Sequence, residues 1–350
     1  MEIRKRIARF FVVIFVFGIL LILVVGGAGR GTAPPIIESV GSPPSQPGNH
    51  TLRIATVNLE GVSVFGLDWS DDIDERFAAM AERLSTNAPL LDVVLIQEAW
   101  KNAARRALLA HEGVMRNFPY RVDIAEQPGG AGLVILSHYP IEMAHFHRFR
   151  SRGQCLKIWE GDCISGKGIM MVRLSLGDHS VWVGNTHLIA CYTRVGEAKT
   201  VCDQQDPNGN YRWDQIIEAR QVIENLVADA PAIFGGDFNF TRTSRYYPLM
   251  VNPEIPADSS RLLSQSLATG YIRGWTESNE EIVEPNRLDY FWTRPGREFR
   301  WHTQENIHPI FTRPVTLRSG KRVPLSDHPV LVTTLCIVRM DDPGNRCLSS

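Results

Sequence analysis

The sequence predicts an α+β fold in which two packed β-sheets carry helices on their outer faces. Short apolar runs rich in Val, Ile and aromatic residues outnumber the helical segments, and some neighbouring runs are joined by short turns such as LGDHS. Such runs are typical of strands, and a sheet with an apolar face must bury it against a second layer. The chain has 350 residues, 44% hydrophobic and 21% charged, which is ordinary for a protein with a sizeable core.

The strands and helices are expected in alternating segments. The expected strands are TLRIATVNL, DVVLIQEA, GLVILS, GIMMVRLSL, SVWVGNTHL, PAIFGGDFN, RLDYFWTR and PVLVTTL. The expected helices are DIDERFAAMAERL and WDQIIEARQVIENLVAD, the second with an apolar face made by Ile216, Ile217, Ile223, Leu226 and Val227 after Trp213. Because no repeat or composition break divides residues 51–338, one domain is expected there, followed by a tail at 339–350.

Residues 1–28 have the pattern of a signal anchor. Four basic residues come before an uncharged run from Phe10 to Ala28, which is long enough to cross a bilayer as a helix. The basic residues predict that the N-terminus stays in the cytoplasm. A cleaved signal peptide is the alternative, since Gly26, Gly27 and Ala28 would suit a signal peptidase. Either way the rest of the chain is expected outside the cytoplasm, anchored to the membrane or secreted.

Residues 29–50 are rich in Gly, Pro and Ser and predict an extended linker. Six cysteines follow in the domain and the tail, as three pairs close in sequence: Cys155 and Cys163, Cys191 and Cys202, Cys336 and Cys347. An even number of cysteines in an oxidising compartment indicates disulfides. Local pairing is expected, although six cysteines allow fifteen pairings and buried free thiols are the alternative.

Several expected strands end in a polar side chain. These side chains are Asn58, Glu98, His187, and Asp237 with Asn239; Asp289 lies within RLDYFW, and Asp327 with His328 precedes the last strand. One such residue usually caps a turn. Six such positions indicate a common site, because strand ends at one edge of a sheet converge.

The chemistry of this set points to phosphate-ester hydrolysis. Asn58, Glu98, Asp237, Asn239 and Asp327 offer oxygen ligands, which suit Mg²⁺, and less specifically Mn²⁺ or Ca²⁺. An imidazole can accept a proton from water near neutral pH. His187 and His328 are the candidates, and Asp289 would orient His328. The predicted reaction is metal-assisted attack of water on a phosphate ester.

The ordered motifs VNLEG, LIQEAW, LVILSHYPI, GNTHL, GGDFN, RLDYF and LSDHPVL resemble the endonuclease/exonuclease/phosphatase superfamily over about residues 51–338. The resemblance implies a catalytic domain with a four-layer αββα sandwich. It implies that Asn58 and Glu98 hold Mg²⁺ and that His328, paired with Asp289, is the general base. The other implied roles are orientation of water and phosphate by Asp237 and Asn239, assistance at the phosphate or leaving group by His187, completion of the metal or water network by Asp327, and scaffolding by Ser137 and Pro140.

The segment GDCISGKG, residues 161–168, nearly matches a phosphate-binding P-loop. A P-loop has Ser or Thr after its lysine and opens a helix, whereas Gly168 and a strand-like run follow here. The longer segment KIWEGDCISGKGIMMVRL is instead similar to the one before the THL strand of neutral sphingomyelinases. This similarity implies that Lys167 faces the substrate phosphodiester. Cys163 and Ile164 stand where that family often has two aromatic residues, and a surface lysine in a hairpin is the alternative.

Three functions are weighed on these features. The first is a monomeric Mg²⁺-dependent phosphodiesterase that acts on a phospholipid such as sphingomyelin. The second is an extracellular nuclease, disfavoured by the net charge of −1 because nucleic-acid binding proteins usually carry a basic excess. A local basic cluster keeps this alternative open: His145, His147, Arg148, Arg150 and Arg152. The third is a catalytically silent binding module, disfavoured by the intact set Glu98, Asp237, Asp327 and His328.

Overall fold

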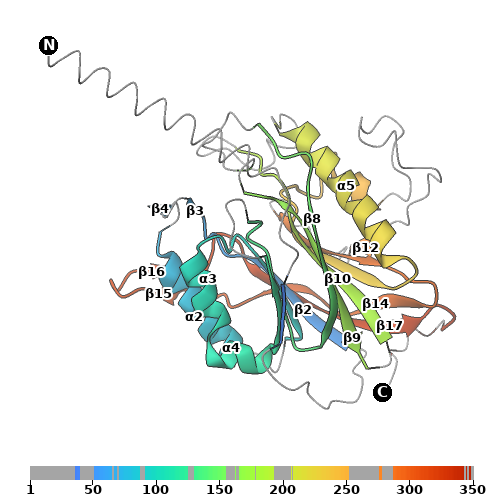
Figure 1. Cartoon of the computed structure of the whole chain (residues 1–350), viewed down its shortest axis with the longest axis horizontal. Helices are drawn as coiled ribbons and strands as arrows, with labels where there is room; N and C mark the ends of the chain where they lie inside the picture. Colours follow the sequence, from blue (N-terminus) through green and yellow to red (C-terminus); the bar gives the residue numbers. More distant parts are fainter. Residues whose placement is uncertain are drawn as a thin grey trace, which may run out of the picture.

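Two packed β-sheets with helices on their outer faces make up the computed structural model of the chain (Figure 1). The structure describes residues 36–39, 51–64, 67–68, 71–86, 91–124, 130–154, 162, 165–177, 179–192, 206, 208–251, 276–277, 287–342, 344 and 347.

The first sheet has seven strands in the order β1-β6-β7-β5-β2-β17-β14. Their bounds are Ile36–Ser39, Tyr120–Asp123, Val134–Ser137, Val93–Gln97, Thr51–Asn58, Val330–Arg339 and Phe299–Ile310, respectively. β2 and β5 are parallel, and the other neighbours are antiparallel.

The second sheet has six strands in the order β12-β13-β11-β10-β9-β8. Their bounds are Thr276–Glu277, Asp289–Arg294, Ala232–Asp237, His179–His187, Gly168–Leu176 and Ile141–Arg148. β10 and β11 are parallel, and the other neighbours are antiparallel. Two short hairpins add β3 (Ser63–Val64) with β4 (Leu67–Asp68), and β15 (Val315–Thr316) with β16 (Arg322–Val323).

Helices α2 (Ile73–Thr86), α3 (Asn102–Leu109) and α4 (Glu112–Asn117) lie on one side of the sheets in Figure 1, and α5 (Gly209–Val227) lies on the other. Helix α6 (Tyr247–Val251) packs in the same cluster as α5. Successive strand residues point to opposite faces. In β2, Ile54 therefore joins the core between the sheets, whereas Ala55 and Val57 join the core under α2–α4. These apolar clusters produce four layers, αββα.

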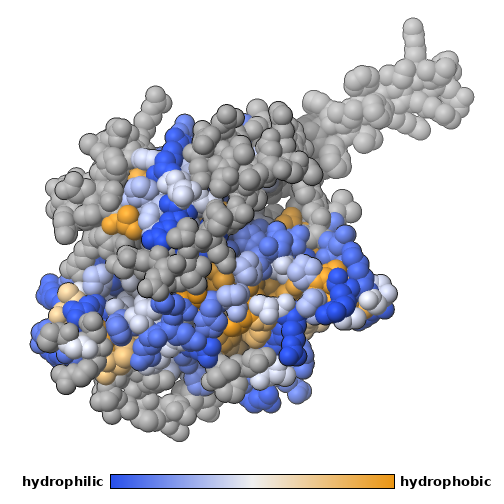
Figure 2. Space-filling model, turned by 180° about the vertical axis from the view of Figure 1, so that it is seen from behind, coloured by the Kyte–Doolittle hydropathy of each residue, from blue (hydrophilic) through white to orange (hydrophobic). Residues whose placement is uncertain are grey.

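The surface of the described residues is mixed in polarity. Figure 2 shows hydrophobic residues in patches between larger hydrophilic areas on the face that it draws. Met143, Tyr192 and Met340 are large hydrophobic residues that are 42–44% exposed. Scattered exposed apolar residues of this kind are normal on a folded domain.

All eight expected strands and both expected helices are present, and the differences lie at sheet edges and in short elements. β14 has no simple alternation of buried and exposed residues, because it is an edge strand that pairs only with β17. Residues 36–39, expected within a linker, form β1 by antiparallel pairing with β6. An edge strand is held by backbone hydrogen bonds, so composition alone does not exclude one.

The predicted pair Cys336–Cys347 is confirmed as a disulfide. Cys191 is also disulfide-bonded, but its expected partner Cys202 lies outside the described residues, as does the pair Cys155 and Cys163. The expected anchor at residues 1–28 lies outside them too. Within the described part of the chain, no helix combines the length and the apolar character needed to cross a membrane.

Candidate active site

The expected site residues converge at one edge of both sheets because of strand register. His187 at the end of β10 pairs with Asp237 at the end of β11, and Asp237 pairs with Asp289 at the start of antiparallel β13. In the first sheet, Asn58 ends β2 opposite Gln97, which ends β5 just before Glu98. β17 runs antiparallel to β2, so its start, just after His328, lies beside the end of β2.

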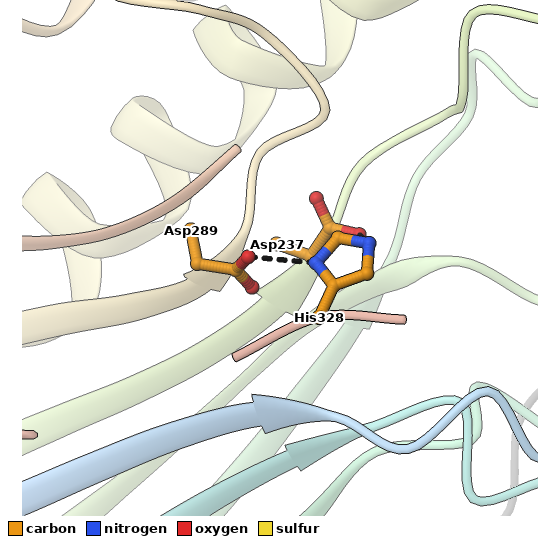
Figure 3. A group of neighbouring side chains, drawn as sticks. All are labelled: Asp237, Asp289 and His328. Atoms are coloured by element: carbon orange, nitrogen blue, oxygen red, sulfur yellow. Dashed lines mark hydrogen bonds and ion pairs between the residues drawn. The ribbon is translucent and has the colours of Figure 1, made fainter. Parts of the chain in front are cut away.

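His328 and Asp289 form a hydrogen-bonded dyad (Figure 3). Nδ1 of His328 lies 2.7 Å from Oδ2 of Asp289, and Nε2 lies 3.9 Å from Oδ2 of Asp237. Burial alone would lower the pKa of His328, but the charges of Asp289 and Asp237 outweigh it and raise this pKa well above its usual value. Burial raises the pKa of Asp289 to about 6, against the opposing effect of His328. With Nδ1 held by Asp289, Nε2 is the nitrogen left to exchange a proton in the site.

Asn58 joins the two carboxylates Glu98 and Asp237. Its Nδ2 donates to Oε1 of Glu98 at 2.9 Å and to Oδ2 of Asp237 at 3.1 Å. Burial raises the pKa of Glu98 to about 7; the hydrogen bond from Asn58 and the charge of Lys167 oppose the rise, and the charge of Asp237 adds to it. The two carboxylates that Asn58 joins supply oxygen donors that fit a hard divalent cation. Oδ1 of Asn58 accepts a hydrogen bond from the Glu60 N–H at 2.9 Å, so Asn58 would ligate a cation only with its amide turned.

One potential ligand atom from each of Asp237, Asp289 and His328 also lies within 4.8 Å of the others. In this group, however, Nδ1 of His328 and Oδ2 of Asp289 are engaged with each other. The arrangement therefore fits an oriented imidazole better than a cation site, which leaves Glu98 and Asn58 as the better place for a cation.

Lys167 lies in the site but is buried, with 2% of the residue exposed. Its Nζ lies 2.9 Å from Nε2 of His187, 2.8 Å from the Leu188 carbonyl and 2.9 Å from Oδ1 of Asp162. These contacts occupy the three donors of an ammonium group. The alternative of a surface lysine is therefore wrong, and the contact between Lys167 and a substrate phosphate stays a prediction.

His187 is held as a neutral imidazole. Burial lowers its pKa well below the usual value, and the charges of Lys167 and His328 act in the same direction. Nε2 of His187 lies 3.5 Å from Oδ2 of Asp237 and 3.7 Å from Oε1 of Glu98. The ring of Trp100 lies beside it, with 5.8 Å between the ring centroids. His187 therefore contacts both carboxylates without carrying a charge of its own.

The GGDFN motif forms a tight turn after β11. Oδ1 of Asp237 accepts a hydrogen bond from the Asn239 N–H at 2.8 Å, and Nδ2 of Asn239 donates to the Leu188 carbonyl at 3.0 Å. Gly236 has φ +133°, and a Cβ there would lie 2.1 Å from the Thr186 carbonyl oxygen. Only glycine lets β11 approach β10 this closely, which brings Asp237 and Asn239 to His187.

Asp327 is exposed and lies at the rim of the buried group. The Ser326 hydroxyl donates to the Asn58 carbonyl at 2.5 Å and lies 3.2 Å from Oδ1 of Asp327. The expected scaffold residues form a turn elsewhere: the Ser137 hydroxyl donates to the Tyr139 carbonyl at 2.8 Å, and the Pro140 carbonyl accepts from the Ser175 N–H at 3.0 Å. The structure therefore brings the expected catalytic residues together, with Asp327 at the exposed rim, where its charge adds to the raised pKa values of Glu98, Asp289 and His328.

Three buried polar residues beneath the site had no assigned role in the sequence. Nε2 of Gln97 donates to Oδ1 of Asn185 at 2.7 Å and to the Thr56 hydroxyl at 3.0 Å. Asn185 in turn donates to the Ile96 and Val134 carbonyls. Polar side chains inside otherwise apolar strands were the available signal, because buried amides need partners. They join the two sheets directly under Glu98 and His187.

The sequence model of the "Endonuclease/Exonuclease/phosphatase family" matches residues 55–328. This span covers most of the chain and includes the residues described above from Asn58 to His328. The chain belongs to the endonuclease/exonuclease/phosphatase family.

Two relatives of this family member carry names from sphingolipid chemistry. One is a Drosophila melanogaster protein assigned as a neutral sphingomyelinase, 25% identical over 83% of this chain and 62% of the relative. The other is an inositol phosphosphingolipids phospholipase C of Saccharomyces cerevisiae, 31% identical over 44% of this chain and 35% of the relative. The chain thus spans less than two thirds of the length of either relative.

Solved structures share the fold of this family member. A beta toxin variant from Staphylococcus aureus with bound magnesium ions has a TM-score of 0.53 and 19% identity, with 81% of this chain and 98% of that chain covered. A D. rerio TDP2 complex with a single-strand DNA product has a TM-score of 0.53 and 15% identity, with 82% and 99% covered. At these identities the likeness concerns the fold.

Proposed function

We propose that the protein is a Mg²⁺-dependent phosphodiesterase that hydrolyses a phospholipid such as sphingomyelin with water as the nucleophile. The observation that carries the proposal is the meeting of the His328–Asp289 dyad with the Asn58–Glu98–Asp237 cluster at one sheet edge. Metal-assisted hydrolysis of a phosphate ester needs a general base and a carboxylate that binds the cation. His328 and Glu98 supply these two groups near Asp237.

Glu98 and Asn58 would hold the cation, which when bound neutralises charge on phosphate and leaving-group oxygens. Mn²⁺ and Ca²⁺ suit the same donor set less specifically. Nε2 of His328 accepts a proton from water, and Asp289 stabilises the resulting imidazolium. Asp237 and Asn239 orient the water and the phosphate, His187 assists at the phosphate or leaving group, and Asp327 closes the network at the rim.

A phospholipid is favoured over nucleic acid by two features. The two relatives above carry sphingolipid names. The basic cluster on and after β8 is also partly neutralised: Oε1 of Glu218 lies 2.6 Å from Nε2 of His147 and 3.8 Å from Nε of Arg150. The enzyme would work as a monomer outside the cytoplasm, anchored by residues 1–28 or secreted after their cleavage. Export is consistent with the Cys336–Cys347 disulfide.

A substrate panel tests this proposal. Sphingomyelin, phosphatidylinositol, a lysophospholipid and plasmid DNA would each be incubated with the purified protein, in Mg²⁺ and in chelator, beside a His328→Ala control. We expect Mg²⁺-dependent cleavage of a lipid that the control lacks. Full activity in chelator would remove the cation from the mechanism, and preferred cleavage of plasmid DNA would replace the lipid with a nucleic-acid substrate.

A further inference from the structure

We infer that Arg76 of α2 is a positioning residue that fixes the loop carrying Asn58 relative to the loop carrying His328. The inference rests on the proposed function, in which Asn58 helps to hold the cation and His328 is the general base. The guanidinium of Arg76 donates from Nη1 to the Leu59 carbonyl at 2.7 Å and to the Leu325 carbonyl at 3.3 Å, and from Nη2 to the Glu60 carbonyl at 3.0 Å.

The carbonyls that Arg76 contacts belong to the two site loops. Leu59 directly follows Asn58, whose amide joins Glu98 and Asp237. Leu325 lies three residues before His328. The Ser326 hydroxyl also donates to the Asn58 carbonyl at 2.5 Å. The two loops are therefore joined directly by the Ser326–Asn58 hydrogen bond, and the side chain of Arg76 connects them a second time.

Packing alone does not explain an arginine at this position. The buried face of α2 is otherwise apolar, with Ile73, Phe77, Met80, Ala81 and Leu84 beside Arg76. Arg76 is 4% exposed, and a buried guanidinium is unfavourable unless its donors are satisfied. Oε2 of Glu60 lies 3.6 Å from Nη1 of Arg76, on a side chain that is 38% exposed. Backbone carbonyls are thus the main partners, including that of Asp71, which accepts from Nε at 3.2 Å.

The consequence concerns catalytic geometry. Asn58 lies on the cation side of the site and His328 supplies the base, and they reach the site from different strands. A displacement of about 1 Å in such a constellation can reduce the rate about a hundredfold. Because Arg76 contacts backbone and not substrate, loosening it should lower kcat and leave KM nearly unchanged.

Arg83 provides a matched control on the same helix. Its guanidinium also donates to backbone carbonyls, those of Phe311 and Arg313. These carbonyls lie more than ten residues before His328 in the chain and are not adjacent to any proposed catalytic residue. Arg76→Lys and Arg83→Lys therefore make the same chemical change in one helix, and differ in whether the carbonyls belong to the site loops.

The experiment measures kcat, KM, Mg²⁺ affinity by calorimetry and the urea unfolding midpoint for wild type, Arg76→Lys and Arg83→Lys. We expect kcat of Arg76→Lys to fall about 30- to 100-fold with KM within twofold, one Mg²⁺-binding site retained, and Arg83→Lys close to wild type. Guanidinium ion added to Arg76→Ala should restore part of kcat and should not raise that of Arg83→Ala.

Equal kcat in the two lysine variants, or a loss in Arg76→Lys that matches its loss of folded protein, would overturn the inference. Should Arg76→Lys unfold, Arg76→Gln, which retains an amide donor, is measured in the same way and a wild-type kcat there would also overturn it. A wild-type protein without activity would instead contradict the proposed function. Activity of wild type and Arg83→Lys therefore tests the proposed function, and the difference between the two lysine variants tests the role of Arg76.

Discussion

The pKa values of two histidines of the site are shifted in opposite directions by their surroundings. Burial lowers the pKa of His187, and the charge of Lys167, 2.9 Å from Nε2, acts in the same direction, so that ring is neutral. Asp289 lies 2.7 Å from Nδ1 of His328 and favours its protonated form. Titratable groups whose pKa values are pushed apart by their surroundings commonly divide acid and base roles. The neutral ring of His328 is the form proposed here to take a proton from water, and Asp289 stabilises the imidazolium that results.

Removing the charge of Asp289 should change both the pKa of His328 and the rate. In Asp289→Asn the carboxylate that raises the pKa of His328 is gone, so we expect this pKa to fall, measured by NMR titration of the metal-free protein. We also expect kcat to fall about 10³- to 10⁴-fold, because an amide neither stabilises the imidazolium nor selects the correct tautomer. Asp229→Asn, which alters an exposed ion pair with Arg297, is the control, and an unchanged His328 pKa in Asp289→Asn would contradict the dyad.

Lys167→Ala should affect stability as well as activity. The variant leaves Asp162, 5% exposed, without its ion-pair partner, and such a loss typically lowers the free energy of unfolding by about 3–5 kcal/mol. We expect kcat to fall about 10- to 100-fold, because His187 loses the neighbour that contacts its Nε2, while Mg²⁺ affinity is unchanged.

The double variant Asp162→Asn with Lys167→Ala separates these two effects. Urea unfolding should show that it regains part of the lost stability, since no unpaired charge is left buried. Its kcat should stay low. A Lys167→Ala protein that matches wild type in both measurements would contradict both the stabilising ion pair with Asp162 and a role for Lys167 at His187.

At the scale of elements, how far the sequence predicts the fold depends on what stabilises each element. β9 is predicted over its full length, Gly168–Leu176, because its first five residues are an apolar run that is buried on both faces and its last residues alternate between buried leucines and half-buried polar residues. β14 is not predicted, since its edge position leaves most of its residues partly exposed. Short helices such as α3 have only about two turns, so their apolar residues do not repeat often enough to show helical periodicity.

The same distinction applies to the site. Glu98 and Asp237 are predictable because a polar residue ends an apolar run, which is a local signal. Arg76 is not, because its partners are carbonyls from residues 59, 60 and 325, brought together only by the tertiary structure. The position of Lys167 is predictable from its motif, but its burial against Asp162 and His187 is not.

Gly236 tests the close approach of β10 and β11. Gly236→Ala would place a Cβ 2.1 Å from a backbone oxygen of Thr186, so the strands must separate. We expect a loss of more than about 3 kcal/mol in the free energy of unfolding, from strain that neighbouring backbone cannot relieve. Gly320→Ala is the control, because Gly320 has φ +81° with nothing within 4 Å of the added Cβ and should lose only about 1–2 kcal/mol. Equal losses of unfolding free energy in the two variants would show that the close approach of β10 and β11 does not require glycine at position 236.

For the whole molecule, the charge arrangement of the site links stability to pH. Burial raises the pKa of Glu98 from 4.5 to about 7 and that of Asp289 from 3.8 to about 6. Between the unfolded and folded pKa values the folded state binds more protons, so stability falls as pH rises through this window. His328 acts in the same direction: its raised pKa stabilises the fold fully below about 6.5, and that contribution is lost at higher pH. The metal-free protein should therefore become less stable between about pH 4.5 and pH 7 and above.

Glu98→Gln should consequently be inactive yet more stable than wild type in chelator at pH 7.5. Glu98 is 15% exposed, and a rise of its pKa to about 7 corresponds to about 3 kcal/mol of stability lost on ionisation. A neutral amide keeps an oxygen for the Asn58 hydrogen bond without that loss. Urea unfolding of both proteins at pH 5 and pH 7.5, with and without Mg²⁺, measures this: the variant should lose less stability on going to pH 7.5 and gain less from Mg²⁺, because a cation that binds only the folded state stabilises it. If the stability of both proteins depends on pH in the same way, the pKa of Glu98 is not raised by burial. If Mg²⁺ stabilises both proteins equally, other residues hold the cation.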